Sequence, residues 1–497
     1  MKLICIGHDY QYAVEQSLLA LFPTERPEYG EDVISPNCAE IRLDETAPGF
    51  FEAKTTLTYD GKTGEGTSSA DLSAETDPYE LEGAKQRCVK LSFFEAARAI
   101  STETPPWGAL TGVRPGKLAA KLLESGKTID ETDAILRDTY YVSDERRRLC
   151  IESAVSGIAA DKALDKRDIS IYIGIPFCPT RCAYCSFVSN SVEKSFHLVE
   201  PYVDALCDEI TSAAQMVKEL GLNVKSFYMG GGTPTTLTAP QMARLLDHFN
   251  ASFDLSHCVE YTVEAGRPDT ITREKLEVLK SRGTDRISIN PQTMENHVLQ
   301  AIGRRHSAED IERAMEVVDP IGFKHVNMDL IVGLPEDTPE GFERTLSRVL
   351  AMGTDNVTVH TLSLKKGSRI MLQNTRIPTA EEVGKMLDHA NPTLRTAGFA
   401  PYYLYRQKYM SGSFENVGWC KKDAECLYNI YIMEELHGIL SLGAGGSTKM
   451  VDRSRNRIER VFNLKFPLEY IQRREKVTAN QEAFAAFYRD MAANGAL

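Results

Sequence analysis

The stretch Ile169-Ser-Ile-Tyr-Ile-Gly-Ile-Pro-Phe-Cys-Pro-Thr-Arg-Cys-Ala-Tyr-Cys185 joins an apolar run to three cysteines spaced Cys-x3-Cys-x2-Cys. The apolar run predicts a buried strand that ends at the proline. The three thiolates of Cys178, Cys182 and Cys185 lie on one loop and can converge on one metal centre, for which soft ligands select zinc, copper or iron–sulfur. A structural zinc site calls for a fourth ligand at matching spacing, and none follows closely. We interpret the triad as an iron–sulfur centre with one open iron; the alternatives are a zinc site and three thiols that cluster by chance.

Working outward, residues 166–375 repeat a strand-then-helix pattern about six times, at roughly 30–40 residues per unit. This pattern predicts parallel strands joined by right-handed helical crossovers. The strands lack polar and apolar alternation, as expected where both faces of a sheet are covered. We therefore predict an α/β core in the form of a partial (βα)6 barrel.

The flanking regions have different patterns. Residues 1–165 predict an α+β extension, with alternating strands around the turn Asp60-Gly61 followed by helices. Residues 376–497 predict a mixed, helix-rich C-terminal domain or lid, within which residues 411–426 are expected to form a loop. The sequence thus predicts three domains, 1–165, 166–375 and 376–497.

Composition narrows the functional classes. The chain has 497 residues, of which 42% are hydrophobic and 26% charged, so a disordered or coiled-coil protein is excluded. A net charge of −13 argues against general nucleic-acid binding. Because we find neither an apolar run of about 20 residues nor a secretory signal, we expect no membrane span and a cytoplasmic location. Eleven cysteines, an odd number, argue against a disulfide framework. Among them, Cys420 and Cys426 are interpreted as buried thiols, with a redox or lid role as the alternative.

Polar and glycine residues follow several of the predicted strands. Met229-Gly230-Gly231-Gly232-Thr233-Pro234 comes after the second strand, where glycines allow close approach of the backbone. Glu264, Gln292 and Asp329 lie at or in the next three strands, and Arg304 follows Gln292 by twelve residues. Barrels of this kind carry their sites at the carboxyl ends of the strands, so these residues are candidates for ligand binding.

Together these motifs resemble the radical S-adenosylmethionine (SAM) superfamily, and within it the oxygen-independent coproporphyrinogen III oxidases. The pattern of that family, Tyr-x-His-Ile-Pro-Phe-Cys-x3-Cys-x-Tyr-Cys, matches residues 172–185. The segments Trp107–Gly116, Glu415–Trp419 and Ser441–Ser447 resemble one sub-branch, the coproporphyrinogen dehydrogenases of Gram-positive bacteria. The resemblance implies that a 4Fe–4S cluster is held by Cys178, Cys182 and Cys185. It implies SAM contacts from Gly230, Gly231, Gly232, Thr233, Glu264, Gln292, Arg304 and Asp329.

The resemblance also implies an activity, which is the oxidative decarboxylation of two propionates of coproporphyrinogen III to vinyls in heme biosynthesis. Tyr172 is the candidate catalytic residue lining the site. The expected partners are the tetrapyrrole substrate, an electron donor such as flavodoxin or ferredoxin, and an unknown electron acceptor. Because the substrate carries four carboxylates, we expect guanidinium groups to bind them. The candidates are Arg267, Arg286, Arg304, Arg305 and Arg406.

Two departures keep alternatives open. Gly174 stands where the family has histidine, and Phe187 stands where the best-known oxidases carry a fourth cysteine. A relative can share the SAM machinery and act on another tetrapyrrole, by methylation or ring opening. It can also bind heme without oxidase turnover, as a chaperone-like protein.

Overall fold

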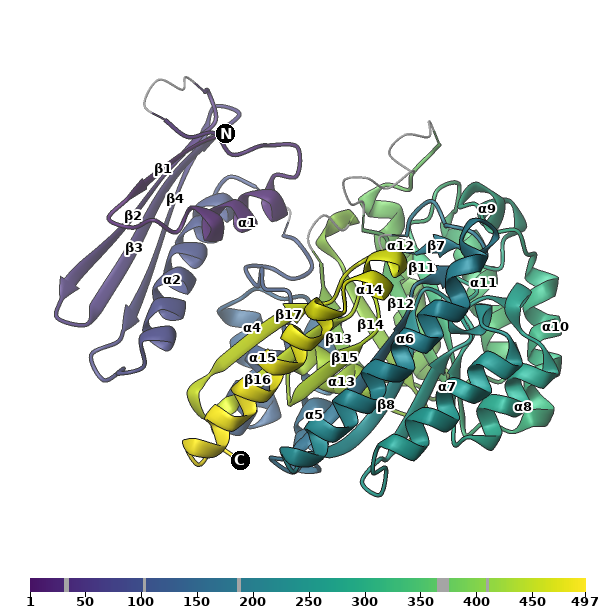
Figure 1. The fold of residues 1–497 in the computed structure, drawn as a ribbon. Coiled ribbons are helices and arrows are strands. Elements are labelled where there is room, and N and C mark those ends of the chain that lie inside the picture. The colour runs from purple at the N-terminus through teal and green to yellow at the C-terminus, as the bar shows by residue number, and fades with distance from the viewer. Residues whose placement is uncertain (31–34, 102–103, 186–188, 364–374, 408–410) are drawn as a thin grey trace. The chain divides into compact units, whose positions relative to one another are not determined.

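The computed structural model describes residues 1–30, 35–101, 104–185, 189–363, 375–407 and 411–497 (Figure 1). It divides into two compact units, Met1–Ile151 and Glu152–Leu497, which we describe separately. No helix among these residues has the length and apolarity needed to cross a membrane. The elements up to residue 162 are β1 (Lys2–Ile6), α1 (Gln11–Leu21), β2 (Cys38–Ala47), β3 (Phe50–Tyr59), β4 (Lys62–Asp71), α2 (Pro78–Arg98), α3 (Gly116–Glu124), α4 (Ile129–Asp138) and α5 (Asp144–Lys162).

The first unit is built on a four-stranded sheet with the order β1-β2-β3-β4. Strand β1 pairs parallel to β2, and the remaining pairs are antiparallel. Helix α2 lies along the sheet (Figure 1). Glycines of β4 permit this approach, because a Cβ at Gly66 would lie 2.1 Å from the carbonyl oxygen of Ser92 in α2. The α+β character expected of this part of the chain is confirmed.

The second unit contains an eleven-stranded sheet with the order β13-β14-β12-β11-β10-β9-β8-β5-β15-β16-β17. Its centre is six neighbouring parallel strands that follow one another in chain order. These strands are β5 (Asp168–Ile175), β8 (Asn223–Gly231), β9 (Glu260–Glu264), β10 (Arg286–Ser288), β11 (His325–Val332) and β12 (Asn356–Thr361). This is the six-unit βα core expected from the sequence, and it confirms the predicted fold class.

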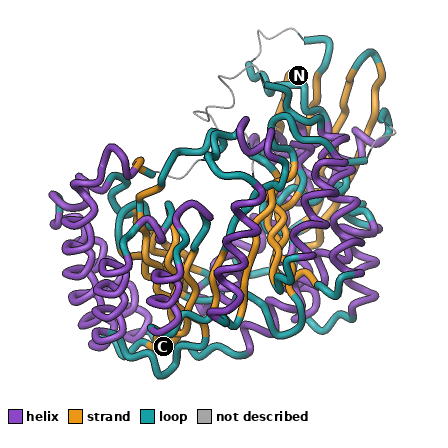
Figure 2. Tube along the Cα trace, turned by 90° about the vertical axis from the view of Figure 1, so that its right-hand side faces the viewer, coloured by secondary structure: helices purple, strands orange, loops and turns teal. Residues whose placement is uncertain are grey.

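Helices connect the parallel strands and lie outside the sheet (Figures 1 and 2). They are α6 (Val192–Glu219), α7 (Ala239–Ser252), α8 (Arg273–Ser281), α9 (Asn296–Ala301), α10 (Ala308–Val318) and α11 (Pro339–Ala351). Several begin at a Thr or Ser whose side chain accepts a hydrogen bond from the first turn, as Thr238 does for α7 and Ser307 for α10. Such caps fix where each strand-to-helix loop ends, and therefore where the strand-end side chains are held.

The last part of the chain completes the sheet at both edges. Its elements are α12 (Ala380–Thr396), β13 (Ala400–Arg406), β14 (Glu415–Cys420), α13 (Leu427–Glu434), β15 (Gly438–Leu442), β16 (Ser447–Asp452), β17 (Arg457–Phe462), α14 (Pro467–Gln472) and α15 (Arg474–Ala493). Strand β14 pairs antiparallel with β12, while β15 pairs parallel with β5. The three-domain division stays a prediction, but strands from residues 400–462 share one sheet with the βα core.

The expected loop at residues 411–426 is wrong over Glu415–Cys420, which forms β14 between β12 and β13. Asn416 and Gly418 had the appearance of turn residues. Every residue of this strand is buried, and Gly418 is needed because a Cβ there would meet the ring of Tyr403 at 1.9 Å. Pairing and packing with neighbouring strands therefore override the local turn signal.

Candidate functional site

The cysteine loop leaves the end of β5 and is closed at its base. The short strand β6 (Phe177–Cys178) pairs parallel with β7 (Asn190–Ser191). The side chains of Cys178, Cys182 and Cys185 are all partly exposed. Among the described residues, no group of three or more His, Cys, Asp or Glu side chains is placed to hold a metal ion. Phe187, one of the two family departures, lies outside the described residues.

Two side chains in the loops that follow β8 and β9 donate hydrogen bonds to sulfurs of the cysteine loop. Thr233 donates from Oγ1 to Sγ of Cys178 at 3.5 Å, and Arg267 donates from a terminal guanidinium nitrogen to Sγ of Cys182 at 3.7 Å. Arg267 is 3% exposed and also forms two hydrogen bonds of 3.0 Å with Asp269 and two of 3.2 Å with Thr180. Its guanidinium therefore anchors the cysteine loop.

The expectation that Arg267 binds substrate carboxylates is accordingly replaced by a role at the loop. Arg286 and Arg406 are also occupied within the protein. Arg286 donates to the carbonyl oxygen of Glu425 at 2.8 Å and to the side chain of Asn356. Arg406 donates twice to the carbonyl oxygen of Ser413, and burial lowers its pKa to about 10. These two arginines stabilise loops and strand ends rather than offering open guanidinium groups.

The glycine segment after β8 packs directly against the chain that leads into the cysteine loop. The N–H of Gly232 donates to the carbonyl of Ile175, and the N–H of Thr233 donates to the carbonyl of Phe177, both at 2.7 Å. A Cβ at Gly232 would lie 2.5 Å from that Phe177 oxygen. Gly231 has φ +103°, a conformation that favours glycine. These contacts occupy the N–H groups of two residues that are candidates for SAM contacts, and they hold the segment against the loop.

A partly exposed polar or aromatic side chain lies in, or just after, each of six neighbouring parallel strands. These side chains are Tyr172 on β5, Tyr228 on β8, Glu264 on β9, Asn290 just after β10, Asp329 on β11 and His360 on β12. Because neighbouring strands are parallel, they lie toward the carboxyl ends on one side of the sheet. Solvent therefore reaches a row of polar and aromatic groups beside the cysteine loop, where βα barrels carry their chemistry.

Glu264 has a perturbed carboxyl group. Its pKa is raised to about 7, mainly by burial; a hydrogen bond of 2.7 Å from the Tyr228 hydroxyl acts to lower the pKa, and the nearby charge of Asp329 acts to raise it. Such a group takes up or gives up a proton near neutral pH and would be held ionised by a bound cation. A Cβ on Gly230 would lie 2.9 Å from this carboxylate, so the glycine lets Glu264 lie against the backbone of β8.

Asp329 lies in a different environment. Burial acts to raise its pKa, but the pKa is lowered overall by His360, whose Nε2 lies 3.8 Å away, and by hydrogen bonds from neighbours. One of these is the 2.8 Å bond that Asn327 donates. Asp329 is therefore an ionised acceptor close to a second carboxyl group of higher pKa. Two neighbouring carboxyl groups whose pKa values differ in this way can bind different ends of one polar ligand.

Gln292 and Arg304 each present a buried polar atom that has no hydrogen-bond partner within the described parts of the chain. Gln292 has φ +69°, and its backbone pairs with β11 while its side-chain oxygen is left unpaired. Arg304 donates to the carbonyl of Asn290 and, at 3.1 Å, to the hydroxyl of Tyr184 in the cysteine loop, whereas its Nε is unpaired. Burial opposes the charge of Arg304, but Tyr184 and Cys182 raise its pKa overall. Buried polar atoms without partners are costly, so these two atoms suit a polar ligand.

Tyr172 belongs to a stack of three tyrosine rings. Its ring centroid lies 6.2 Å from that of Tyr228 and 6.3 Å from that of Tyr428, while Tyr228 and Tyr428 are 4.4 Å apart. Burial and the charge of Glu264 raise the pKa of Tyr172, so it stays a neutral phenol. The sequence analysis missed Tyr228, Asn290 and His360, which the rule of polar or aromatic residues near strand ends would have found. It also missed Tyr428, for which helix α13 gave no signal.

The first family departure, Gly174, has a structural reason. A Cβ at Gly174 would lie 2.7 Å from the carbonyl oxygen of Ala444, in the glycine-rich turn between β15 and β16. The hydroxyl of Tyr202 bridges the same contact, donating to the Gly174 carbonyl at 2.6 Å and accepting from the N–H of Ala444 at 2.8 Å. The backbone of the turn thus occupies the space that a larger side chain at residue 174 would need.

Cys420 and Cys426 are both buried, at 3% and 2% exposure. The Cys426 thiol donates to a carboxylate oxygen of Glu260 at 3.4 Å, and burial raises the pKa of both thiols. This environment is that of packed, protonated thiols.

The chain is similar to known proteins over most of its length. The family model of the radical SAM superfamily matches residues 172–349. The oxygen-independent coproporphyrinogen-III oxidase-like protein HemZ of Bacillus subtilis is 40% identical over 409 residues, covering 81% of this chain and 82% of HemZ.

Two further relatives match a shorter part. The heme chaperone HemW of Bacillus subtilis is 32% identical over 47% of this chain and 62% of HemW. The oxygen-independent coproporphyrinogen III oxidase of Salmonella typhimurium is 31% identical over 47% of this chain and 51% of that protein. Among solved structures, Escherichia coli coproporphyrinogen III oxidase (HemN), titled a radical SAM enzyme, has the same fold, with a TM-score of 0.52 and 23% identity over 65% of this chain and 72% of HemN. The chain therefore belongs to the radical SAM superfamily, in the family of oxygen-independent coproporphyrinogen III oxidase-like proteins.

Proposed function

We propose that this protein is an oxygen-independent coproporphyrinogen III dehydrogenase. It would convert two propionates of coproporphyrinogen III to vinyls and so form protoporphyrinogen IX. The observation that carries the proposal is the row of strand-end groups beside the cysteine loop, in a chain similar to HemZ over most of its length. The proposal includes a cytoplasmic location, which suits oxygen-sensitive chemistry.

Membership of the superfamily implies a 4Fe–4S cluster and SAM as cofactors. The donor chemistry of Cys178, Cys182 and Cys185 fits the cluster, since thiolates are the usual ligands of iron–sulfur centres. The unpaired side-chain oxygen of Gln292 and the unpaired Nε of Arg304 fit a ligand with both donors and acceptors, as SAM has. When bound together, the two cofactors would supply the radical that takes a hydrogen atom from each propionate, which then loses carbon dioxide and passes one electron to an acceptor.

The protein's own groups would bind and orient the reactants. In the proposal, Glu264 faces the ammonium end of SAM, Asp329 and Gln292 bind its hydroxyl or base groups, and Arg304 binds its carboxylate. The Gly230–Thr233 segment fixes the position of Glu264 against the loop. Tyr172, with the rings stacked on it, provides a flat apolar wall that excludes water from the reacting carbon.

Two other functions are the alternatives to this proposal, and similarity to a known heme chaperone favours the first of them. Similarity to the heme chaperone HemW, and glycine at residue 174 where the family has histidine, both suit a protein that binds heme without turnover. A radical enzyme acting on a different tetrapyrrole, by methylation or ring opening, would use the same cofactor-binding groups.

The experiment that separates these functions is anaerobic. Protein reconstituted with iron and sulfide is given SAM, a strong reductant and coproporphyrinogen III, and products are identified by mass spectrometry. Vinyl products together with 5′-deoxyadenosine support the proposal. Formation of 5′-deoxyadenosine without vinyl products would indicate a radical enzyme that acts on a different substrate. Tight heme binding without 5′-deoxyadenosine supports the chaperone. A Cys182→Ala variant that keeps the full iron and sulfide content would contradict the ligand assignment, and zinc in the native protein would contradict the cluster itself.

A further inference from the structure

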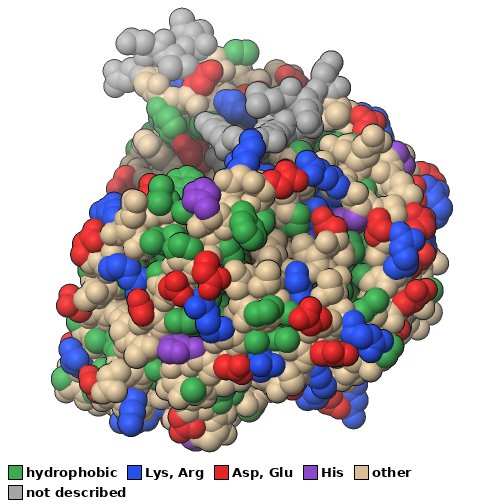
Figure 3. Space-filling view, turned by 45° about the vertical axis from the view of Figure 1, so that its right-hand side comes forward, with side chains coloured by type: hydrophobic (Ala, Val, Ile, Leu, Met, Phe, Trp, Pro, Cys, Tyr) green, Lys and Arg blue, Asp and Glu red, His purple; other side chains and the backbone are tan. Residues whose placement is uncertain are grey.

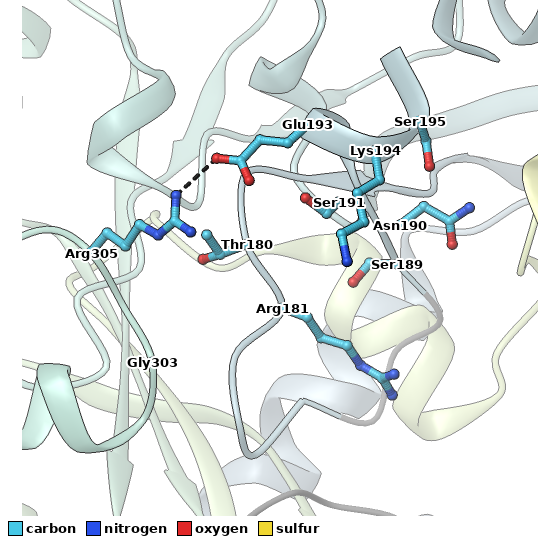
Figure 4. Close-up of a pocket in the computed structure, with 10 residues that line it drawn as sticks. All are labelled: Thr180, Arg181, Ser189, Asn190, Ser191, Glu193, Lys194, Ser195, Gly303 and Arg305. Atoms are coloured by element: carbon cyan, nitrogen blue, oxygen red, sulfur yellow. Dashed lines mark hydrogen bonds and ion pairs between the residues drawn. The ribbon is translucent and has the colours of Figure 1, made fainter. Parts of the chain in front are cut away.

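A cavity of about 620 Å³ opens beside the cysteine loop, on the side of the loop that faces the start of α6 (Figure 4). Its walls are the loop itself at Thr180 and Arg181, the strand β7, and the first turn of α6 at Lys194 and Ser195. Ser195 has non-helical φ and ψ of −123° and 18°, so the helix bends here. The bend places the first turn of α6 alongside the loop.

The charge of this region is opposite to that of the whole chain. Arg181, Lys194 and Arg305 are exposed at the cavity, against one carboxylate, Glu193. Arg305 pairs with Glu193 at 2.8 Å, and neither Arg181 nor Lys194 pairs with a carboxylate among the residues described (Figure 4). The chain as a whole has a charge of −13. On the face drawn in Figure 3, by comparison, Lys and Arg alternate with Asp and Glu.

All three cations, Arg181, Lys194 and Arg305, line this cavity. Arginine is enriched at protein–protein interfaces, where charge sets the rate and orientation of encounter. We name Arg181, Lys194 and Arg305 the loop face.

The loop face is close to the candidate cluster ligands along the chain. Arg181 directly precedes Cys182, and Thr180 accepts hydrogen bonds from Arg267, which also donates to the Cys182 sulfur. A protein seated here would contact the loop that holds the cluster in the proposed function. Electron transfer slows steeply with distance, so this is a favourable approach for a reductant.

We propose that the loop face docks a small acidic electron-transfer protein, which passes one electron to the cluster and is itself oxidised by one electron. The inference rests on the proposed function, because it requires a cluster on the cysteine triad. Positive charge on an otherwise acidic protein would steer an acidic donor to this face and repel it from the rest of the surface. A small anionic metabolite is the other occupant that the charge would accept, and the experiment distinguishes it.

The test measures reduction of the cluster rather than enzyme turnover. Full-length reconstituted protein is mixed anaerobically in a stopped-flow instrument with reduced flavodoxin, an acidic donor, and loss of cluster absorbance is followed. A neutral reductant, photoreduced 5-deazariboflavin, is used in parallel. Lys194→Glu, which lies outside the loop, and the double variant Arg181→Glu/Lys194→Glu are compared with the matched control Arg273→Glu/Lys280→Glu on exposed positions of α8.

We expect the double variant to be reduced by flavodoxin at least tenfold more slowly at low salt, and Lys194→Glu severalfold more slowly. The control and all reactions with the neutral reductant should match the wild type. Raising the salt concentration should slow the wild type and have little effect on the double variant. Equal flavodoxin rates in the double variant and the control would overturn the inference and leave a small anion as the occupant. Absence of iron and sulfide from the wild type would instead overturn the proposed function.

Discussion

Gly232 is the position at which the substitution of a single methyl group has the most direct structural consequence. In Gly232→Ala the new Cβ would lie 2.5 Å from the Phe177 carbonyl oxygen and 2.8 Å from that of Ile175. Ordinary contact begins at 3.4 Å, so the strand end and the loop must separate by about 0.9 Å. The neighbours are backbone atoms, and no side-chain rotation can relieve the contact.

Two hydrogen bonds of 2.7 Å cross this contact, from the N–H groups of Gly232 and Thr233. Loss of a hydrogen bond costs about 1 kcal/mol, and overpacking costs about 1–3 kcal/mol. Since the bonds would be lengthened rather than fully broken, we expect the free energy of unfolding to fall by about 2–4 kcal/mol. SAM binding should weaken as well, because Glu264 is held against the same segment.

The assay uses the two tryptophans of the chain, Trp107 in the first unit and Trp419 in the second, both buried. In a Trp107→Phe background, urea unfolding followed by fluorescence reports on the second unit alone. Gly157→Ala in α5 is the control, because its Cβ meets only the flexible side chain of Glu434, at 3.3 Å. A Gly232→Ala variant whose stability stays within about 1 kcal/mol of the wild type would refute the packing argument.

Three further predictions address the same region. Because burial raises the pKa of Glu264 from 4.5 to about 7, the folded protein without cofactors keeps a proton that the unfolded chain loses. Stability should therefore fall as pH rises from 4.5 through 7, and Glu264→Gln should flatten this slope in urea midpoints measured at pH 5 and 8, while an unchanged slope would count against it. Arg267→Met leaves the 29%-exposed Asp269 unpaired and should cost about 2–3 kcal/mol, partly recovered by adding Asp269→Asn. In reconstituted protein the same variant should make the cluster potential more negative in a redox titration followed by electron paramagnetic resonance, and an unchanged potential would show that the bond to Cys182 is not formed. Gly174→Ala should lower stability by about 1–3 kcal/mol because of the Ala444 carbonyl, and a variant as stable as Gly157→Ala would contradict that contact.

The sequence predicted the βα core well because its signal is local and repeated. Buried apolar strands such as Asp168–Ile175 and capped helices such as Ala239–Ser252 can each be predicted from the residues within and next to them. The prediction was wrong for β14. Asn416 and Gly418 favour a turn when judged from the local sequence, and they form a strand because they pack against Tyr403 and β14 pairs with β12.

The candidate site residues also divide into those that the local sequence indicates and those that depend on contacts distant in the sequence. Glu264 and Asp329 were predicted as candidates because polar residues in or at the ends of apolar strands are easily recognised in the sequence. The destination of Arg267 was not predictable, since its partners at Thr180 and Cys182 are 87 and 85 residues away in sequence. A guanidinium gives no sequence signal that separates an internal anchor from an open carboxylate binder, and only contacts decide between them.

The parallel pairing of β5 with β15 has a consequence for the order of events during synthesis. Strand β5 leads into the cysteine loop, yet one of its two neighbours is made only when residues 438–442 emerge from the ribosome. Until then that edge of β5 is an open row of unpaired backbone groups, prone to wrong pairing. The Gly174 contact with Ala444 is also delayed until this late stage. A cell making this protein would therefore do best to deliver iron and sulfide after translation is nearly complete, and chains cut short before residue 438 should be substrates for chaperones and proteases.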